Sequence, residues 1–247
     1  MKHFFRFLVF CWLLLFATTV FAQTKVVVIP MGGNKAVGDA TAQDVVEGKT
    51  FSSDSGTGLT GTRSPGIPAT TGQTLCYDTV GDQISCTGTG QDGEVQKGVA
   101  VTPRFINNGD GTVTDNLTGL IWLQEGNCTT FFAGDAAVSN SRPWQVALDA
   151  ANQLASGYCG LTDGSAAGDW RLPNLRELQS LVDYSQISPS LPAGNPFLNT
   201  VSSDYWSSTT YALYTNYAWL VNFSNGSDSY YYGKSSSYYV RAVRGGQ

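Results

Sequence analysis

The sequence contains little of what most catalytic and metal sites require. Only 13% of its 247 residues are charged, and its one histidine is His3. Because His3 lies in a segment that we expect to be removed on export, the mature chain would contain no imidazole. Ser-His-Asp and Cys-His catalysis and His-ligated zinc, copper or non-haem iron sites are thereby excluded.

Basic residues are scarce as well. The chain has 14 Lys and Arg against 19 Asp and Glu, which gives a formal charge of −5. A protein that binds nucleic acid or an anionic membrane needs a basic surface, so we expect neither partner. The hydrophobic content of 42% and the 28 glycines indicate a globular core of short strands joined by many turns.

The N-terminus is typical of a secretory signal peptide over residues 1–22. Lys2 and Arg6 precede an apolar run at 7–16, and a cleavage point follows Ala22. The run is too short for a membrane anchor, which needs about 20 apolar residues. We therefore expect a secreted, periplasmic or cell-surface protein with no membrane insertion after signal removal. Without Lys2 and Arg6, 12 basic residues face 19 acidic ones, a charge of −7.

We expect a stalk or spacer at residues 23–64. After a short β-branched run at 25–30, residues 34–63 are poor in large apolar side chains, so this piece cannot bury enough surface to fold alone. Residues 44–51 and 58–62 resemble a short module of bacterial surface and phage-tail-like proteins. The resemblance implies a stalk or spacer that self-associates, with a homotrimer as the candidate assembly. Residues 65–101 begin with Pro65 and Pro68 among Gly and Thr, which predicts a linker.

Four cysteines remain after signal removal, and an even count in an exported chain predicts two disulfides. Sequence alone allows three pairings of Cys76, Cys86, Cys128 and Cys159. Residues 76–86 have the pattern of a hairpin with Gly81-Asp82 at its turn, which favours Cys76 with Cys86 and, by remainder, Cys128 with Cys159. A metal-thiolate centre is disfavoured because no C-x-x-C spacing occurs. We expect no metal and no cofactor.

The pattern from residue 102 to residue 247 predicts an α+β domain with two helices and short strands. Helices are expected at 143–154 and 174–182, the second with a capping box of Asn174 and Glu177. At 108–111 a tight turn is favoured over a calcium loop, because Gly119 stands where an EF-hand would place its closing Glu. Strands are expected at 104–107, 112–115, 119–123, 205–208, 218–223 and 239–244.

Two of these elements have predicted faces. In the strand at 218–223, Trp219, Val221 and Phe223 share the expected core face, whereas Leu220, Asn222 and Ser224 are expected to face outward. The first helix should bury residues at helical spacing, namely Trp144, Val146, Ala147, Ala150, Ala151 and Leu154.

Several long motifs occur in a fixed order along this domain. They are Asn108-Gly109-Asp110-Gly111-Thr112-Val113-Thr114-Asp115, Thr118-Gly119-Leu120-Ile121-Trp122, Asp169-Trp170-Arg171-Leu172-Pro173-Asn174, Tyr205-Trp206-Ser207-Ser208 and Val240-Arg241-Ala242-Val243-Arg244. Together they resemble the Lcl C-terminal domain family of bacterial exported proteins over residues 102–247. The resemblance implies a C-type-lectin-like fold, a scaffold distantly akin to the formylglycine-generating enzymes.

The residues do not support the chemistry of those distant relatives. Formylglycine-generating enzymes use a reactive cysteine pair that holds copper, whereas Cys128 and Cys159 are better explained as a disulfide. The tripeptides with which C-type lectins hold calcium and sugar do not occur, and the basic residues are too few for the sulfated polysaccharides that some relatives bind. A hydrolase that used Asp163, Asp169 or Glu177 would need a pair of carboxylates, and no two acidic residues stand at a spacing that implies shared acid–base chemistry. We therefore expect no enzyme.

Residues 211–239 have an unusual composition. These 29 residues hold eight of the 12 tyrosines and six serines, with Asp228 and Lys234 as their only charges. Tyr with Ser, Gly and Asn is the composition of antibody paratopes, because Tyr offers rigid contact area at a small entropic cost. We predict a binding surface for a protein or glycan, formed by Tyr211, Leu213, Tyr214, Tyr217, Leu220, Ser224, Asp228, Ser229, Tyr230, Tyr231, Tyr232, Ser235, Ser236, Ser237 and Tyr238.

The codons that this segment allows suggest how it arose. Every residue except Trp219 and Lys234 can be encoded by a codon that ends in a pyrimidine. Leu, Ser, Tyr, Asp and Gly codons can all be reached from an asparagine codon by replacing adenines. The segment thus resembles the variable region of proteins diversified by a retroelement that mutates adenines. The implied fixed scaffold is Trp219, Val221, Phe223, Val240 and Arg241.

A second interpretation gives the tyrosines no ligand. Tyr, Ser and Gly are also common on exposed strands of secreted β-rich proteins. The protein would then be a structural or adhesive surface protein, with an oligomerising N-terminal module and a passive C-terminal domain.

Overall fold

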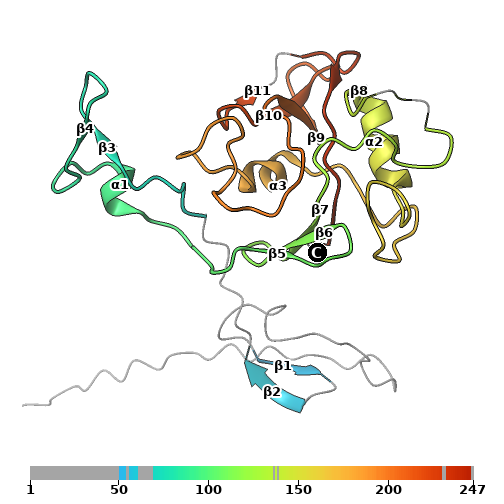
Figure 1. Cartoon of the computed structure of the whole chain (residues 1–247), viewed down its shortest axis with the longest axis horizontal. Helices are drawn as coiled ribbons and strands as arrows, with labels where there is room; N and C mark the ends of the chain where they lie inside the picture. Colours follow the sequence, from blue (N-terminus) through green and yellow to red (C-terminus); the bar gives the residue numbers. More distant parts are fainter. Residues whose placement is uncertain are drawn as a thin grey trace, which may run out of the picture.

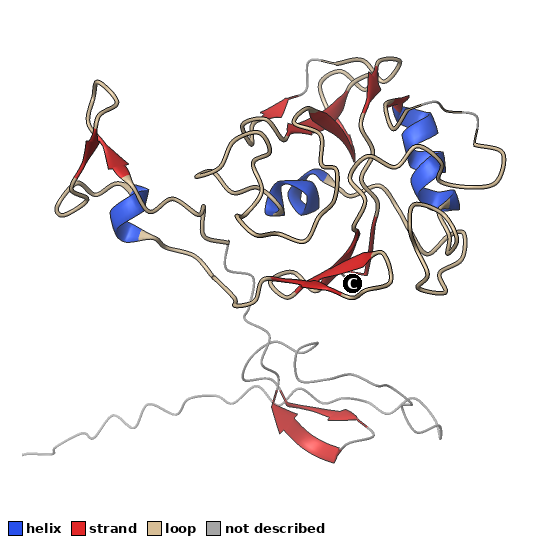
Figure 2. Ribbon diagram, in the orientation of Figure 1, coloured by secondary structure: helices blue, strands red, loops and turns tan. Residues whose placement is uncertain are grey.

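The computed structural model describes residues 50–53, 56–60, 69–135, 137, 139–229 and 232–245. The predicted signal peptide lies outside these residues, as does most of the predicted stalk, of which the hairpin of β1 (Thr50–Ser53) and β2 (Gly56–Thr60) is described. A few helices and several small antiparallel sheets, joined by long loops, confirm the predicted α+β class (Figures 1 and 2).

The larger sheet begins as the predicted meander. β5 (Phe105–Asn107), β6 (Thr112–Asp115) and β7 (Leu120–Leu123) pair in sequence order, and the final strand β13 (Val243–Gly245) pairs with β7. The predicted tight turn before β6 is confirmed. Its Asp110 carboxylate accepts hydrogen bonds from the Thr112 backbone N–H at 3.0 Å and the Thr112 hydroxyl at 2.6 Å. Both ends of the domain therefore meet in one sheet.

A second sheet carries the tyrosine-rich segment. Its strands are β9 (Asp204–Thr210), β10 (Ala218–Asn222) and β11 (Asp228–Ser229), with β10 in the middle. Beside it, the short strands β8 (Arg142–Pro143) and β12 (Ser237–Tyr238) pair with each other. The predicted strand at 239–244 is wrong before Val243. There the Asn140 carboxamide replaces a neighbouring strand, donating to the Val240 carbonyl at 2.9 Å and accepting from its N–H at 3.1 Å.

Both predicted helices form. α2 spans Trp144–Gln153 and α3 spans Leu175–Ser180. The capping box of α3 is confirmed, because Asn174 Oδ1 accepts from the Glu177 N–H at 3.0 Å while Glu177 Oε2 accepts from the Asn174 N–H at 2.8 Å. The predicted burial of Val146 is wrong, and its side chain is 45% exposed. One residue turns a helix by about 100°, which rotates Val146 away from the buried stripe of Ala147, Ala150 and Ala151.

The core lies on both faces of the β9–β10 pair. On one face Trp206 and Leu220 pack with the alanines of α2. On the other face Tyr205, Val221 and Phe223 pack with Leu178 of α3. The prediction that Leu220 faces outward is therefore wrong, since its side chain is 0% exposed. The alternating pattern was interpreted as a sheet with one solvent-exposed face, but α2 covers one face of β10 and α3 covers the other.

Both predicted disulfides are confirmed. Cys76–Cys86 closes the hairpin of β3 (Cys76–Tyr77) and β4 (Gln83–Ile84), which projects with α1 (Asp92–Val95) at the left of Figure 1. Cys128–Cys159 joins the two segments that flank α2. The hairpin unit is attached to the domain where Tyr184 N–H donates to the Thr71 carbonyl at 2.8 Å. In the described ranges, no helix has the length and apolar character needed to cross a membrane.

Candidate binding surface

Two loops of the tyrosine-rich segment lie side by side beyond the Ala218 end of β10. Residues 211–217 turn back on themselves, with Tyr211 N–H donating to the Tyr217 carbonyl at 3.0 Å. The second loop joins them through an antiparallel bridge between Tyr217 and Gly233 and a 2.9 Å hydrogen bond from Lys234 N–H to the Asn216 carbonyl. We define the tyrosine face as Trp144, Tyr211, Leu213, Tyr214, Tyr217, Trp219, Tyr232, Lys234 and Tyr238.

The first half of the tyrosine face is a run of touching rings. Tyr211 and Tyr214 have ring centres 6.0 Å apart, as do Tyr214 and Tyr217. The Tyr211 ring meets Trp219 edge to face at 5.4 Å. Leu213 and Tyr214 project furthest, with 70% and 56% of their surfaces exposed. This half therefore presents apolar side chains to solvent above a supporting layer of aromatic rings.

The second half is built around Tyr238. Its ring packs against Tyr232 at 4.9 Å and edge to face against the buried Trp206 at 5.1 Å. Burial, followed by the neighbouring Tyr232 and Asp204, raises the pKa of Tyr238 to about 12. The phenol therefore keeps its donor proton further into the alkaline range than an exposed tyrosine does.

One cation stands on the tyrosine face. Lys234 Nζ lies 3.9 Å from the centre of the Trp144 ring and donates to Thr210 Oγ1 at 2.9 Å. Trp144 is fixed in turn, because its indole N–H donates to the Ser207 carbonyl at 2.8 Å and its backbone N–H to the Lys234 carbonyl at 3.0 Å. Cation and ring thus hold each other in a set geometry.

The structure brings together only part of the predicted set. Tyr211, Leu213, Tyr214, Tyr217, Tyr232 and Tyr238 lie on the tyrosine face, and Ser235, Ser236 and Ser237 follow Lys234 in sequence. Leu220 is in the core. Ser224 lies beyond the opposite end of β10, where its hydroxyl is bonded to Asn222, and Asp228 and Ser229 form the edge strand β11. Tyr230 and Tyr231 lie outside the described residues.

Sequence reasoning missed three residues of the tyrosine face. Trp144 and Trp219 were predicted to be core residues, yet both are half-buried, and Lys234 was noted only as a charge. Trp144 is the first residue of α2. A side chain there points back toward the helix N-terminus, and this is the signal that could have placed it beside the loops.

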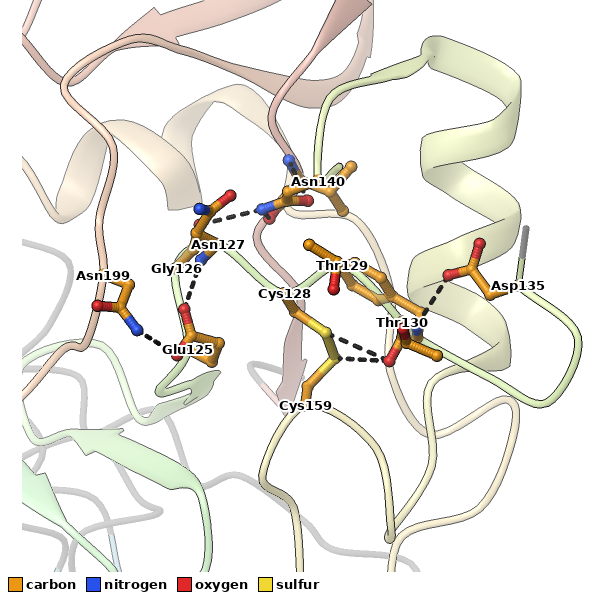
Figure 3. Close-up of a disulfide and its surroundings, with 12 residues drawn as sticks. Glu125, Gly126, Asn127, Cys128, Thr129, Thr130, Asp135, Asn140, Cys159 and Asn199 are labelled. Atoms are coloured by element: carbon orange, nitrogen blue, oxygen red, sulfur yellow. Dashed lines mark hydrogen bonds between the residues drawn. A yellow bond between two sulfur atoms is a disulfide. The ribbon is translucent and has the colours of Figure 1, made fainter. Parts of the chain in front are cut away.

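A hollow of about 320 Å³ lies beside the Cys128–Cys159 disulfide, whose polar surroundings are drawn in Figure 3. Its carboxylate, Glu125, is already bonded at both oxygens, accepting from the Asn127 N–H and from Asn199 Nδ2, each at 2.8 Å. Across the described segments, no three His, Cys, Asp or Glu side chains gather at metal-binding distance.

The carboxylates considered for hydrolysis each have a partner in the fold. Asp163 pairs with Arg244 at 3.1 Å, and Asp169 accepts from the Ala166 N–H at 2.8 Å. Glu177 is bonded to Arg171 at 2.7 Å as well as to the cap of α3.

The structure defines a class: a disulfide-bonded α+β domain of small antiparallel sheets, which fits an extracellular or secreted protein. The chain belongs to the Lcl C-terminal domain family, whose sequence model matches residues 111–244. A comparison with curated proteins finds no match.

Proposed function

We propose that the protein is a secreted or surface-exposed binding protein that captures a protein or glycan ligand on the tyrosine face without catalysis. The observation that carries the proposal is the backbone pairing that joins the 211–217 and 232–238 loops, which carry exposed apolar and aromatic side chains, with Leu213 70% and Tyr214 56% exposed. Exposed aromatic and apolar patches mark interaction sites, and rigid tyrosines lose little entropy on binding. The scaffold would be a C-type-lectin-like domain, as the family resemblance implies.

The expected setting agrees with this role. The family match supports a surface-associated domain, and disulfides persist only in oxidising compartments such as the periplasm or the cell exterior. With the predicted signal peptide at 1–22, the tyrosine face would be available to ligands outside the cytoplasm. The predicted homotrimer of the stalk would present several copies of it.

Photo-cross-linking from two exposed positions tests the proposal. p-Benzoyl-L-phenylalanine would replace Tyr214 on the tyrosine face in one variant and Ile187, which is 77% exposed, in the other. Ile187 is a matched control, because its neighbour Ser188 is bonded to Ser224 beyond the other end of β10. After irradiation on intact cells, we expect a discrete cross-linked ligand from position 214 and none from 187. Equal products from both positions would contradict the proposal.

The structural or adhesive interpretation has its own support, since the β1–β2 hairpin gives the N-terminal module a strand pair. Truncation before Ser64, followed by chemical cross-linking, separates the two roles. If assembly is lost while ligand capture through Tyr214 continues, the binding function is favoured. If capture is lost along with assembly, the adhesive stalk is favoured.

A retroelement origin for the segment is a separate proposal, and the burial of individual side chains limits which positions could vary. Leu220 is 0% exposed and belongs with the fixed scaffold, so we propose that variation is confined to the exposed positions. Sequencing the DNA that flanks the gene should reveal a near-copy of the segment that carries adenines where the gene differs. A copy that is identical at those codons would reject the diversification while leaving the binding surface in place.

A further inference from the structure

Resting on the proposed function, we propose that the tyrosine face recognises a protein partner through an Asp or Glu side chain set in an apolar patch, and that Lys234 is the residue that binds this carboxylate. The inference draws on three properties of the tyrosine face: the fixed position of the ammonium group, its lack of a carboxylate partner, and the uneven shape of the surrounding aromatic surface.

The ammonium group is positioned before any ligand arrives. Lys234 Nζ is held by the Thr210 hydroxyl at 2.9 Å and by the Trp144 ring at 3.9 Å, and the backbone of Lys234 is bonded on both sides. An ammonium group has three N–H donors. Thr210 takes one of them and the aromatic ring covers one side, which leaves donor capacity for an incoming acceptor. Little side-chain entropy remains to be lost on binding.

The charge of Lys234 is not neutralised by the fold. The ion pairs in the described part of the chain all use arginine, and no carboxylate there lies within ion-pair distance of Lys234. Lys234 is also the only basic residue between positions 211 and 239 of a chain whose net charge is −5. The half-buried cation therefore gives this surface a preference for an acidic group.

The shape of the tyrosine face favours a protein over a sugar. Neighbouring tyrosine rings are inclined at 47° and 54° in the first half and at 53° in the second, so they do not form one flat platform on which a sugar ring can stack. Leu213, an aliphatic side chain with few uses in sugar binding, is the most exposed apolar residue of the tyrosine face. An uneven apolar surface with one cation suits side chains that interlock across a protein interface.

Selection from a random dodecapeptide library displayed on phage tests the inference. The bait is the full chain without residues 1–22, used as wild type, Lys234→Met, Lys234→Arg and the control Lys97→Met, whose side chain is exposed on the hairpin unit. Methionine keeps the packing of the lysine stem on Trp144 but removes the charge. A glycan array containing glucuronic acid and neutral sugars is probed in parallel with the same four proteins.

We expect wild type and Lys97→Met to enrich peptides that carry Asp or Glu beside Leu, Phe or Tyr. Lys234→Met should bind such peptides about tenfold more weakly, and changing the peptide's Asp to Asn should weaken binding to wild type by a similar factor. Lys234→Arg should retain most of the affinity, since it keeps the charge and the ring contact.

Three results would overturn the inference, and they differ in what they say about the proposed function. Enrichment of neutral apolar peptides that Lys234→Met binds equally well would reject the acidic ligand but keep the binding surface. Capture of glucuronic acid glycans in the absence of any enriched peptide would reject the protein partner. No binding in either format, together with no cross-link from position 214, would reject both proposals.

Discussion

Arg142 and Asp135 form a two-pronged ion pair, with Nη1 2.8 Å from Oδ1 and Nη2 2.9 Å from Oδ2, and their side chains are only 2% and 4% exposed. The pair fixes the segment on which the tyrosine face stands. Arg142 is paired with Tyr238 in the β8–β12 ladder, its carbonyl accepts from Trp206 Nε1 at 2.8 Å, and Trp144 follows two residues later.

Removing the charge of Asp135 should be costly. Asp135→Asn leaves the Arg142 guanidinium buried without its partner, and we expect a loss of about 3–5 kcal/mol in the free energy of unfolding. Asp149→Asn on the exposed side of α2 should change it by less than about 0.5 kcal/mol. Urea denaturation followed by tryptophan fluorescence measures both, and equal midpoints for the two variants would show that the ion pair adds nothing.

Tyr238 should make stability sensitive to alkali. Its folded pKa is raised to about 12 by burial, Tyr232 and Asp204, against about 10 in an unfolded chain. The stabilising contribution is therefore complete below pH 10 and is lost as the pH rises through 12. Thermal melts between pH 9 and pH 12 should fall more steeply for wild type than for Tyr238→Phe. If the melting temperatures of the two proteins fell in parallel, Tyr238 would be exposed to solvent in the folded state.

Gly126 should not tolerate a methyl group. A Cβ there would lie 2.7 Å from Arg241 Nη2 and 2.8 Å from Thr200 Cα. Arg241 cannot give way, because it is fully buried over the Phe197 ring, 4.7 Å away. We expect Gly126→Ala to lower the free energy of unfolding by about 1–3 kcal/mol. Gly233→Ala, whose Cβ would meet nothing closer than 3.8 Å, is the control and should be nearly neutral. A neutral Gly126→Ala would be the contrary result.

The two disulfides should differ in effect. Cys128–Cys159 spans 31 residues around α2 and Cys76–Cys86 spans 10. Stabilisation grows with the length of the closed loop, so replacing the 128/159 pair with serine should cost about 3–4 kcal/mol of domain stability. The 76/86 double variant should unfold the hairpin unit locally and leave the melting temperature of the main domain nearly unchanged. Differential scanning calorimetry distinguishes these outcomes, and the reverse order would be inconsistent with this structure.

Leu220 and Leu213 allow a direct test of which leucine is core. Leu220→Ala should cost about 2–5 kcal/mol because it leaves a cavity between β10 and α2. Leu213→Ala, at a side chain that is 70% exposed, should stay within about 0.5 kcal/mol of wild type. Chemical denaturation of both variants measures the difference. If both substitutions lowered the free energy of unfolding by the same amount, Leu220 would not be a core residue.

Local signals predicted much of the fold. The capping box at Asn174, the turn before β6 and the hairpin closed by Cys76 and Cys86 depend on residues that are close in sequence, so the pattern of the residues was sufficient. Leu220 was misplaced because its burial depends on α2, whose packing against β10 no alternation pattern records. The segment before Val243 was misread for a similar reason, since at Val240 the partner is the side chain of Asn140 rather than a strand.

The sequence predicted the composition of the candidate site but did not identify all of its residues. Tyrosine content pointed to residues 211–239, and six of the predicted residues do lie on the tyrosine face. Ser224 was grouped with them by composition and by its predicted outward face, although β10 separates it from the loops. Trp144 comes from a helix more than sixty residues earlier and is linked to the site by the Ser207 carbonyl and Lys234. Such long-range partners have no signature in a single sequence.

The Asn140 carboxamide holds Gly126 and Val240 at once, through bonds of 3.0 Å to the Gly126 carbonyl and 2.9 Å to the Val240 carbonyl. The chain therefore re-enters the interior at one defined residue after the tyrosine-rich loops. Insertions or exchanges upstream cannot make β13 slip along β7, because a slip would tear these bonds and turn Val243 toward water. The hydrogen bonds of Asn140 would therefore allow the outer loops to change in sequence without altering the scaffold beneath them.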